Sequence, residues 1–295
     1  MKTLFLLVLL GAASLAGAAP IRVVVWDEQQ PSQKKAYTNF LGSQIASYLK
    51  TLPDVSVKSV SLTDPDQGLA DETIMNCDVL VWWSHVKNKL VPDAKVQQIV
   101  GRVQEGRLSL VVLHSALTSK VFIEAMNERT REDAAKSVPA GLKTEFILPK
   151  AYKDPLPTDP ITPRVELVTN WPAHTPLALV YLPICEITGW HEDGLPSRVT
   201  TLLPDHPIAK GLPKEFEIPH DETYVEPFHV PKPDAVIFQE SWEKYEQAFR
   251  SGMLWNVGAG KVFYFRPGHE TLPVYLQAEP LKIIGNAVEF LGRRK

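Results

Sequence analysis

Three apolar stretches of the chain each end in a histidine, and these histidines are the residues best suited to chemistry. Each one follows a predicted strand: His85 after Val79–Trp83, His114 after Ser109–Leu113, and His269 after Lys261–Arg266. Ligands of open α/β sheets bind beyond the carboxyl ends of the strands. Imidazole groups there can bind a metal ion or transfer protons near neutral pH. The sequence therefore predicts one site built from three strand-end histidines.

Carboxylates accompany the histidines. Glu270 directly follows the third histidine, Glu222 lies in a polar turn, and Glu28 follows the first predicted strand. A carboxylate beside a histidine can act as a general base or can orient the imidazole. We therefore predict catalytic roles for His114 and Glu28. For Glu222 the residues alone favour a solvated polar turn, and the alternative for Glu28 is a surface acid that ends its strand.

His85 and His269 are the predicted metal ligands. Hydrolytic zinc sites combine three protein ligands with an open position, and three strand-end imidazoles could supply such a set. The alternative is that each imidazole bonds a backbone carbonyl in its loop. The chain lacks the short-range spacing His-Glu-x-x-His, so the residues favour a site more strongly than a metal. The expected cofactor is a divalent metal such as zinc, and no nucleotide cofactor is expected.

Six further side chains are predicted to bind substrate: Trp83, Ser115, His220, Tyr224, Arg266 and Glu270. Ser115 lacks the flanking glycines of a Gly-x-Ser-x-Gly nucleophile, so we interpret it as a hydrogen-bonding residue. Trp82 and Trp83 alternate across a strand, so one should pack in the core while the other could hold a sugar face. Arg266 could clamp a hydroxyl or carboxylate, or could pair with Glu270 in the interior.

Strands and helices alternate in the part of the chain that must position these residues. Predicted strands cover Ile21–Trp26, Val55–Leu62, Val79–Trp83, Leu108–Leu113, Val236–Gln239, Ala248–Asn256 and Lys261–Arg266. Predicted helices cover Lys35–Leu49, Ala70–Met75, Asp93–Gln104, Lys120–Asn127 and Leu281–Leu291. This order predicts an α/β fold with a mostly parallel central sheet and helices on both faces. A loop-rich insertion from about residue 128 to 184 interrupts the pattern.

The first 18 residues have the features of a signal peptide. Lys2 precedes the apolar stretch Leu4–Leu10, and Ala16-Gly17-Ala18 has the small residues of a cleavage site. We therefore expect a single α/β domain over residues 19–295, exported to the periplasm or the cell exterior. The apolar stretch is too short to favour a membrane span, so no membrane contact is expected after cleavage.

The bulk composition limits the partners. A net charge of −3 and a pI of about 6.3 give no electrostatic footprint for nucleic acid. A homo-oligomer remains open. Export would permit a disulfide, but nothing brings Cys77 and Cys185 together, so two separate buried thiols are favoured over a bridge.

Five motifs in order resemble the ThuA-like family, which is named for trehalose utilisation. They are Leu80–His85, Leu113-His114-Ser115, Asp205–Gly211, His220–Pro227 and Phe263–Thr271. The resemblance implies a flavodoxin-like fold related to class I glutamine amidotransferases. Their nucleophilic cysteine lies on the turn that here carries His114-Ser115, so an amidotransferase reaction is not expected. The family is linked to the catabolism of disaccharides and their oxidised, 3-keto forms. The resemblance also implies that the polar turn His220-Asp221-Glu222 is functional, and we predict Glu222, in preference to Asp221, as its catalytic residue.

The chain departs from the family pattern at two places. Many members carry an Arg-His-Glu group and a Pro-x-Gly-Ile-His group where this chain has Gln29-Gln30-Pro31 and Thr38–Gly42. The expected function is a hydrolase or isomerase of oxidised, 3-keto glycosides with a carbohydrate ligand. A carbohydrate-binding protein without turnover is the main alternative. A third is a partner-binding protein, which would expose an apolar patch on the insertion.

Overall fold

The computed structural model describes residues 19–149, 155–156, 158–168 and 176–293. The predicted signal peptide, residues 1–18, lies outside the described residues. Within the described part of the chain, no helix combines the length and the apolar character needed to cross a bilayer.

A nine-stranded sheet, counted over the described residues, forms the centre of the fold in the order β10-β9-β12-β13-β14-β4-β3-β1-β2. Its parallel strands are β1 (Ile21–Asp27), β2 (Val55–Ser61), β3 (Val79–Trp83), β4 (Ser109–Leu113) and β14 (Gly260–Phe265). Its antiparallel strands are β9 (Ser197–Thr201), β10 (Glu215–Ile218), β12 (Ala235–Trp242) and β13 (Gln247–Val257). The parallel order 2-1-3-4-14 is that of flavodoxin-like folds.

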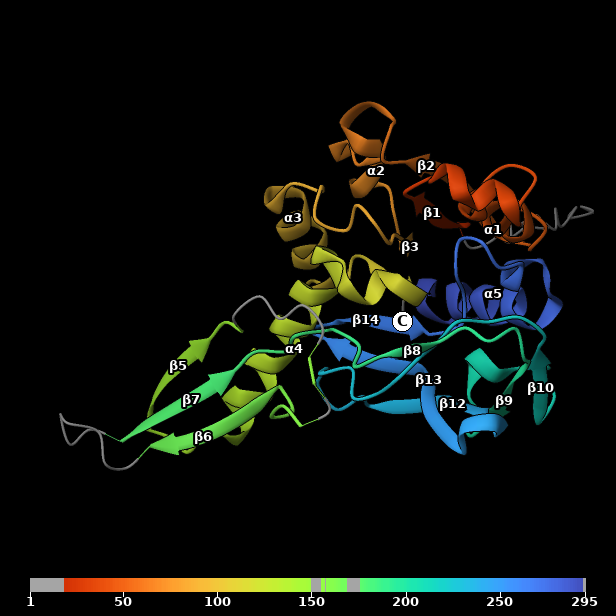
Figure 1. Cartoon of the computed structure of the whole chain (residues 1–295). Helices are drawn as coiled ribbons and strands as arrows, with labels where there is room; N and C mark the ends of the chain where they lie inside the picture. Colours follow the sequence, from red (N-terminus) through yellow and green to blue (C-terminus); the bar gives the residue numbers. More distant parts are fainter. Residues whose placement is uncertain (1–18, 150–154, 157, 169–175, 294–295) are drawn as a thin grey trace, which may run out of the picture.

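Helices cover both faces of this sheet (Figure 1). On one face lie α1 (Leu41–Leu49) and α5 (Ala278–Gly292), and on the other lie α2 (Asp71–Met75), α3 (Asp93–Gln104) and α4 (Lys120–Ser137). All residues of β3 and β4 are buried, as expected for parallel strands that are covered on both sides. The sheet therefore separates two core layers, one on each face, and the ends of its strands are left uncovered by these helices. We call the edge formed by the carboxyl ends of the parallel strands the rim.

Two helices differ from their predicted bounds. The first helix begins at Leu41 and not at Lys35, because the Gln33 side chain accepts a hydrogen bond from the Leu41 backbone and Asp27 accepts one from Gly42. Helix α4 continues to Ser137, beyond the predicted end at Asn127. The insertion therefore starts later than residue 128.

Tertiary contacts explain why the polar second half of α4 remains helical. Arg129 pairs with Asp133 one turn further on and with Asp234 from the neighbouring loop. Glu132 accepts a hydrogen bond from the Gly258 backbone at 2.7 Å. These charged side chains attach the helix to the sheet where the apolar pattern has faded.

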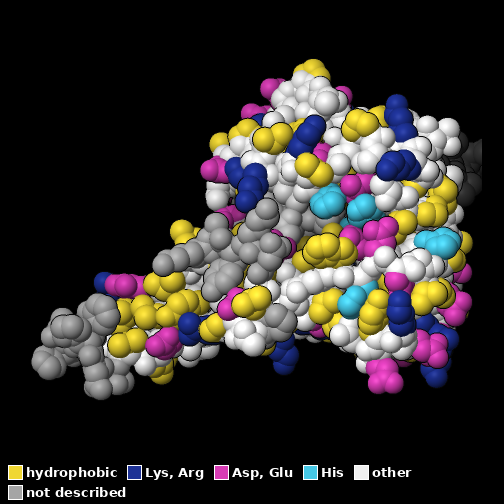
Figure 2. Space-filling view, in the orientation of Figure 1, with side chains coloured by type: hydrophobic (Ala, Val, Ile, Leu, Met, Phe, Trp, Pro, Cys, Tyr) yellow, Lys and Arg dark blue, Asp and Glu magenta, His cyan; other side chains and the backbone are white. Residues whose placement is uncertain are grey.

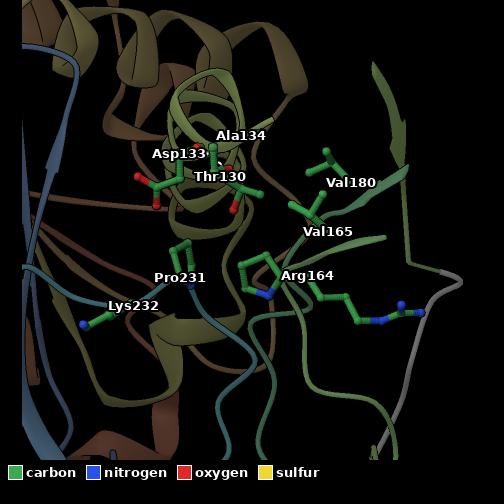
Figure 3. A pocket seen from close by; sticks show the side chains of 10 residues that line it. Thr130, Asp133, Ala134, Arg164, Val165, Val180, Pro231 and Lys232 are labelled. Atoms are coloured by element: carbon green, nitrogen blue, oxygen red, sulfur yellow. Dashed lines mark hydrogen bonds between the residues drawn. The ribbon is translucent and has the colours of Figure 1, made fainter. Parts of the chain in front are cut away.

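The insertion contains a small three-stranded sheet of order β5-β7-β6 that projects from the main body (Figure 1). Its strands are β5 (Lys143–Ile147), β6 (Arg164–Val168) and β7 (Leu177–Tyr181). A cavity of about 200 Å³ separates α4 from this sheet, with Thr130 and Ala134 across from Val165 and Val180 (Figure 3). Hydrophobic side chains gather on the projecting sheet (Figure 2), among them the exposed Phe146 and Leu167.

The two cysteines are separate. Cys77 and Cys185 are both buried and free, which confirms the preference for two thiols. Burial raises the pKa of the Cys77 thiol to about 12, so it stays protonated and unreactive at neutral pH.

Candidate active site

The three strand-end histidines lie together at the carboxyl ends of β3, β4 and β14. The ring centres of His85 and His269 are 5.6 Å apart, and those of His114 and His269 are 5.9 Å apart. Histidine and acidic side chains gather at one place on the face shown in Figure 2. The parallel register brings residues distant in the sequence to one rim.

His114 and Glu222 form the buried half of the site. His114 adopts a positive φ of 47° at the turn after β4, a conformation that is uncommon for residues other than glycine. Its Nε2 lies 3.0 Å from Glu222 Oε2, and its Nδ1 lies 2.8 Å from the Arg266 carbonyl oxygen. The carbonyl can only accept, so Nδ1 donates. The hydrogen bond at Nε2 then requires one more proton, which His114 and Glu222 share.

The second half is a cluster of His85, His269 and Glu270. His85 Nδ1 lies 3.0 Å from Glu270 Oε2, and His269 Nε2 lies 3.4 Å from the same oxygen. One ligand atom from each residue can be chosen so that all lie within 4.8 Å of one another. His269 Nδ1 bonds the Thr271 hydroxyl at 2.8 Å, which leaves Nε2 facing the carboxylates. Glu222 Oε2 is 3.9 Å from that Nε2, so His269 joins the two halves.

Burial and neighbouring charges shift the pKa values of the histidines and carboxylates in the site. The hydrogen bond to Glu270 raises the pKa of His85 against the effect of burial. Burial and the charge of His114 lower the pKa of His269. Burial alone would raise the pKa values of Glu222 and Glu270, but hydrogen bonds and charges from the histidines outweigh it, so both pKa values lie below the ordinary value. Both carboxylates are therefore ionised at neutral pH.

We expect the His85–Glu270 pair to stabilise the metal-free protein most in mildly acidic solution. The pKa of His85 is raised, so its contribution is complete below its ordinary value of 6.5 and is lost as the pH rises through the folded-state pKa. The pKa of Glu270 is lowered, so its contribution is present above 4.5 and is lost as the pH falls through the folded-state pKa. Because His85 is 36% exposed, solvent screening limits the effect to about 1 kcal/mol or less.

Thermal unfolding in the presence of a chelator, from about pH 4 to pH 8, measures this contribution. Glu270→Gln removes the pair and should flatten this part of the pH profile. Identical profiles for the two proteins would contradict the prediction.

Glu28 holds the loop that carries His85 in place through hydrogen bonds to its backbone. Its carboxylate accepts hydrogen bonds from the backbone of His85 at 2.8 Å and of Lys87 at 3.0 Å. The side chain is buried, so the surface-acid alternative is wrong. In this geometry both oxygens are occupied with holding the loop that carries His85, and Glu28 acts as a positioning residue.

Only some of the predicted substrate-binding residues lie in the site. Glu270 is in the cluster, and Tyr224 stacks on His114 with ring centres 4.2 Å apart. Ser115 donates to the Ser84 carbonyl at 2.8 Å, so its hydroxyl is used in holding two loops together. His220 is exposed and precedes the buried Asp221 and Glu222. It marks the outer edge of the site.

Neither tryptophan of β3 offers a sugar platform. Trp82 and Trp83 do alternate across the strand, but helices cover both faces, so both are buried. Trp82 stacks on Trp26 with ring centres 4.1 Å apart. Trp83 packs in the other core layer.

Arg266 lies beneath the site and is fully buried. Its guanidinium pairs with Glu240 and donates to the Tyr224 carbonyl at 2.9 Å. Pairing with Glu270 is therefore wrong, and the clamp on substrate has no exposed guanidinium to make it. The sequence analysis missed Glu240, whose only signal is an acidic residue directly after the predicted strand Val236–Gln239.

Asp221 is a third ionisable residue that is buried close to Arg266 and Glu240. It accepts a hydrogen bond at 2.9 Å from the backbone of Gly268, whose φ of 140° belongs to the turn that presents His269. Burial and the neighbouring carboxyl of Glu240 raise the pKa of Asp221 well above its ordinary value. The ion pair of Arg266 with Glu240 and the hydrogen bond from Gly268 to Asp221 together form the buried layer under the site.

The strand order, the two helical layers and the rim site define an α/β protein of the flavodoxin-like, glutamine amidotransferase-like class. The chain belongs to the ThuA family, whose model is described as trehalose utilisation and matches residues 22–291. Both the fold class and the family resemblance predicted from the motifs are confirmed.

Solved structures support the fold. A ThuA-like protein from Bacteroides uniformis is 13% identical with a TM-score of 0.57, over 95% of each chain. A ThuA-like protein from Parabacteroides merdae is 14% identical with a TM-score of 0.60, over 92% of this chain and 90% of the other. At such identities the likeness concerns the fold alone. No curated protein sequence matches the chain.

Proposed function

We propose that this ThuA family member is an exported enzyme that acts on oxidised, 3-keto glycosides as a hydrolase or isomerase. The observation that carries the proposal is the 3.0 Å hydrogen bond between His114 Nε2 and Glu222 Oε2, beside a second cluster of imidazoles and a carboxylate. A proton acceptor next to groups that can bind oxygen or metal is the arrangement needed to abstract a proton beside a carbonyl.

The donor set of His85, His269 and Glu270 fits a divalent metal such as zinc. Two imidazole nitrogens and one carboxylate oxygen form a common ligand set for catalytic zinc, which leaves a further position for water or substrate. The three donor atoms already lie within 4.8 Å of one another. When bound, such a cation would polarise a carbonyl oxygen of the substrate.

One chemical step serves both the hydrolase and the isomerase proposals. In a 3-keto glycoside the ketone acidifies the hydrogen on carbon 2, and the glycosidic oxygen on carbon 1 lies β to the ketone. Glu222, with His114, would take the carbon 2 proton. The released electron pair forms a double bond between carbons 1 and 2 as the glycosidic oxygen leaves and is protonated. Addition of water gives the free sugar, whereas return of the proton without bond cleavage isomerises the substrate.

The decisive experiment supplies the pure protein with native disaccharides and their 3-keto forms, with and without chelator. We expect a free reducing sugar from the keto forms only, and less of it after chelation. Glycans that raise the melting temperature while no glycoside yields product would support the binding-protein alternative. Cleavage of native and keto forms at equal rates would contradict proton abstraction beside a ketone.

We expect His269→Ala to lose the metal. The substitution removes one of three donors, so zinc affinity measured by titration calorimetry should fall by at least about 10–100-fold. His220→Ala is the matched control, because His220 is exposed and outside the cluster. Equal zinc content in His269→Ala and the unaltered protein would remove the ligand role.

A further inference from the structure

A groove of about 870 Å³ lies beside His85, and the proposed reaction does not use it. Its walls come from the loop after β3, the first half of α4, the end of β5 and residues 183–186. The volume lies in the upper part of the range for small-molecule sites, about 300–1,000 Å³. The groove can therefore hold a group larger than one polar substituent.

Aliphatic and polar side chains both line the groove. The aliphatic ones are Val86, Leu90, Ile123, Leu148 and Ile184, with Pro149 and Pro183 beside them, and the charged ones include Lys87, Lys89 and Glu186. Leu90 and Leu148 are 56% and 71% exposed, and exposed apolar residues gathered around one hollow indicate a surface for an apolar group. No aromatic side chain lines the groove among the described residues. The aliphatic part of the wall offers no hydrogen-bond partner to the hydroxyls of a second sugar, whereas it can remove the carbons of an apolar group from water.

The groove also contains one polar position without a full set of partners. Asn127 lies on its wall and is nearly fully buried. Its Nδ2 donates to Glu124 at 2.9 Å, whereas its Oδ1 has no hydrogen-bond partner among the residues described. That oxygen has almost no solvent-accessible surface, so it does not face a ligand in the groove, and contact with a ligand falls to the other lining residues.

The groove continues directly from the candidate site, because His85 belongs both to its wall and to the cluster with Glu270. We propose that it binds the aglycone of the substrate, and that this aglycone is a mainly apolar group and not a second sugar. The proposal rests on the proposed function, since the glycosidic bond at the site defines which part of the substrate is the aglycone.

Binding of unreactive, unoxidised glycosides tests the groove separately from turnover. Calorimetry with methyl and cyclohexyl α-glucosides compares two ligands that share one sugar. We expect the cyclohexyl compound to bind about 10–100-fold more tightly, because the groove removes its additional carbons from water. Its binding should also show the more negative heat-capacity change.

Leu90→Asp places a charge on the exposed wall and should abolish the preference for the cyclohexyl compound. Leu203→Asp is the matched control, because Leu203 is similarly exposed at 40% and lies outside the groove. Equal affinities for the two glucosides, or binding of neither, would overturn the groove proposal. A cyclohexyl preference without turnover of any keto-glycoside would overturn the proposed function and leave the groove as an aglycone-sized ligand site.

Discussion

Replacing Glu222 by glutamine should lower the turnover of a 3-keto glycoside by about 10²–10⁴-fold, the usual contribution of a positioned general base. The amide has the same shape and can donate to His114 Nε2, so the imidazole should stay in place. It cannot accept the substrate proton, however. Because the pKa of Glu222 lies below its ordinary value, the native carboxylate is ready to accept a proton throughout the neutral range.

The matched control is Glu105→Gln, the same substitution at a carboxylate that is 55% exposed and directly follows the C-terminal end of α3. We expect its turnover to stay within about threefold of the unaltered protein, as for surface changes in general. Steady-state kinetics should show the loss in kcat for Glu222→Gln with little change in KM, since the interaction acts on the reacting proton. Turnover of Glu222→Gln close to that of the control would exclude Glu222 as the base.

The meeting of the histidines was predictable from the sequence because it follows from simple topology. Buried apolar strands that alternate with helices form a parallel sheet, and the residues after their carboxyl ends share one rim. His85, His114 and His269 each follow such a strand, and the structure brings them together. The chemistry of these histidines depends on the side chains that contact them, such as Glu222 and Glu270.

The roles of several partners were not predictable because they depend on the path of loops. Glu28 comes at the right end of β1, but whether its carboxylate faces substrate or backbone depends on the loop after β3, which folds over it. Trp83 is a different case. The alternation with Trp82 was predicted correctly, and the predicted helices on both faces of the sheet already implied that neither tryptophan would be free to hold a sugar.

Strands β9 and β10 could not be predicted because the alternation of polar and apolar residues in each is too short to indicate a strand. Each spans only a few residues with alternating polar and apolar side chains. Their positions are set by pairing in the sheet, of β9 with β12 and of β10 with β9. Helix α4 was predicted too short for a related reason. Its second half is held by ion pairs to residues more than 100 positions away, such as Asp234, and local propensity cannot report such contacts.

Replacing Arg266 by methionine should destabilise the fold by about 3–5 kcal/mol, the range for breaking a buried ion pair by removing one partner. The guanidinium is fully buried and balances Glu240, which is also fully buried. Methionine fills similar space but leaves Glu240 with no cation. The melting temperature should fall by roughly 5–15 °C, and differential scanning calorimetry measures it directly.

Two further variants separate the charge from the packing. Glu240→Gln combined with Arg266→Met removes both charges, so part of the lost stability should return, as expected for coupled residues. Arg198→Met is the exposed control: Arg198 is 52% exposed and pairs with Glu217 across β9 and β10, and surface pairs of this kind contribute about 0–1 kcal/mol. If Arg266→Met unfolds no earlier than Arg198→Met, the buried pair does not stabilise the buried layer under the site. The positions of His269 and Glu270 would then depend on the Asp221–Gly268 hydrogen bond instead.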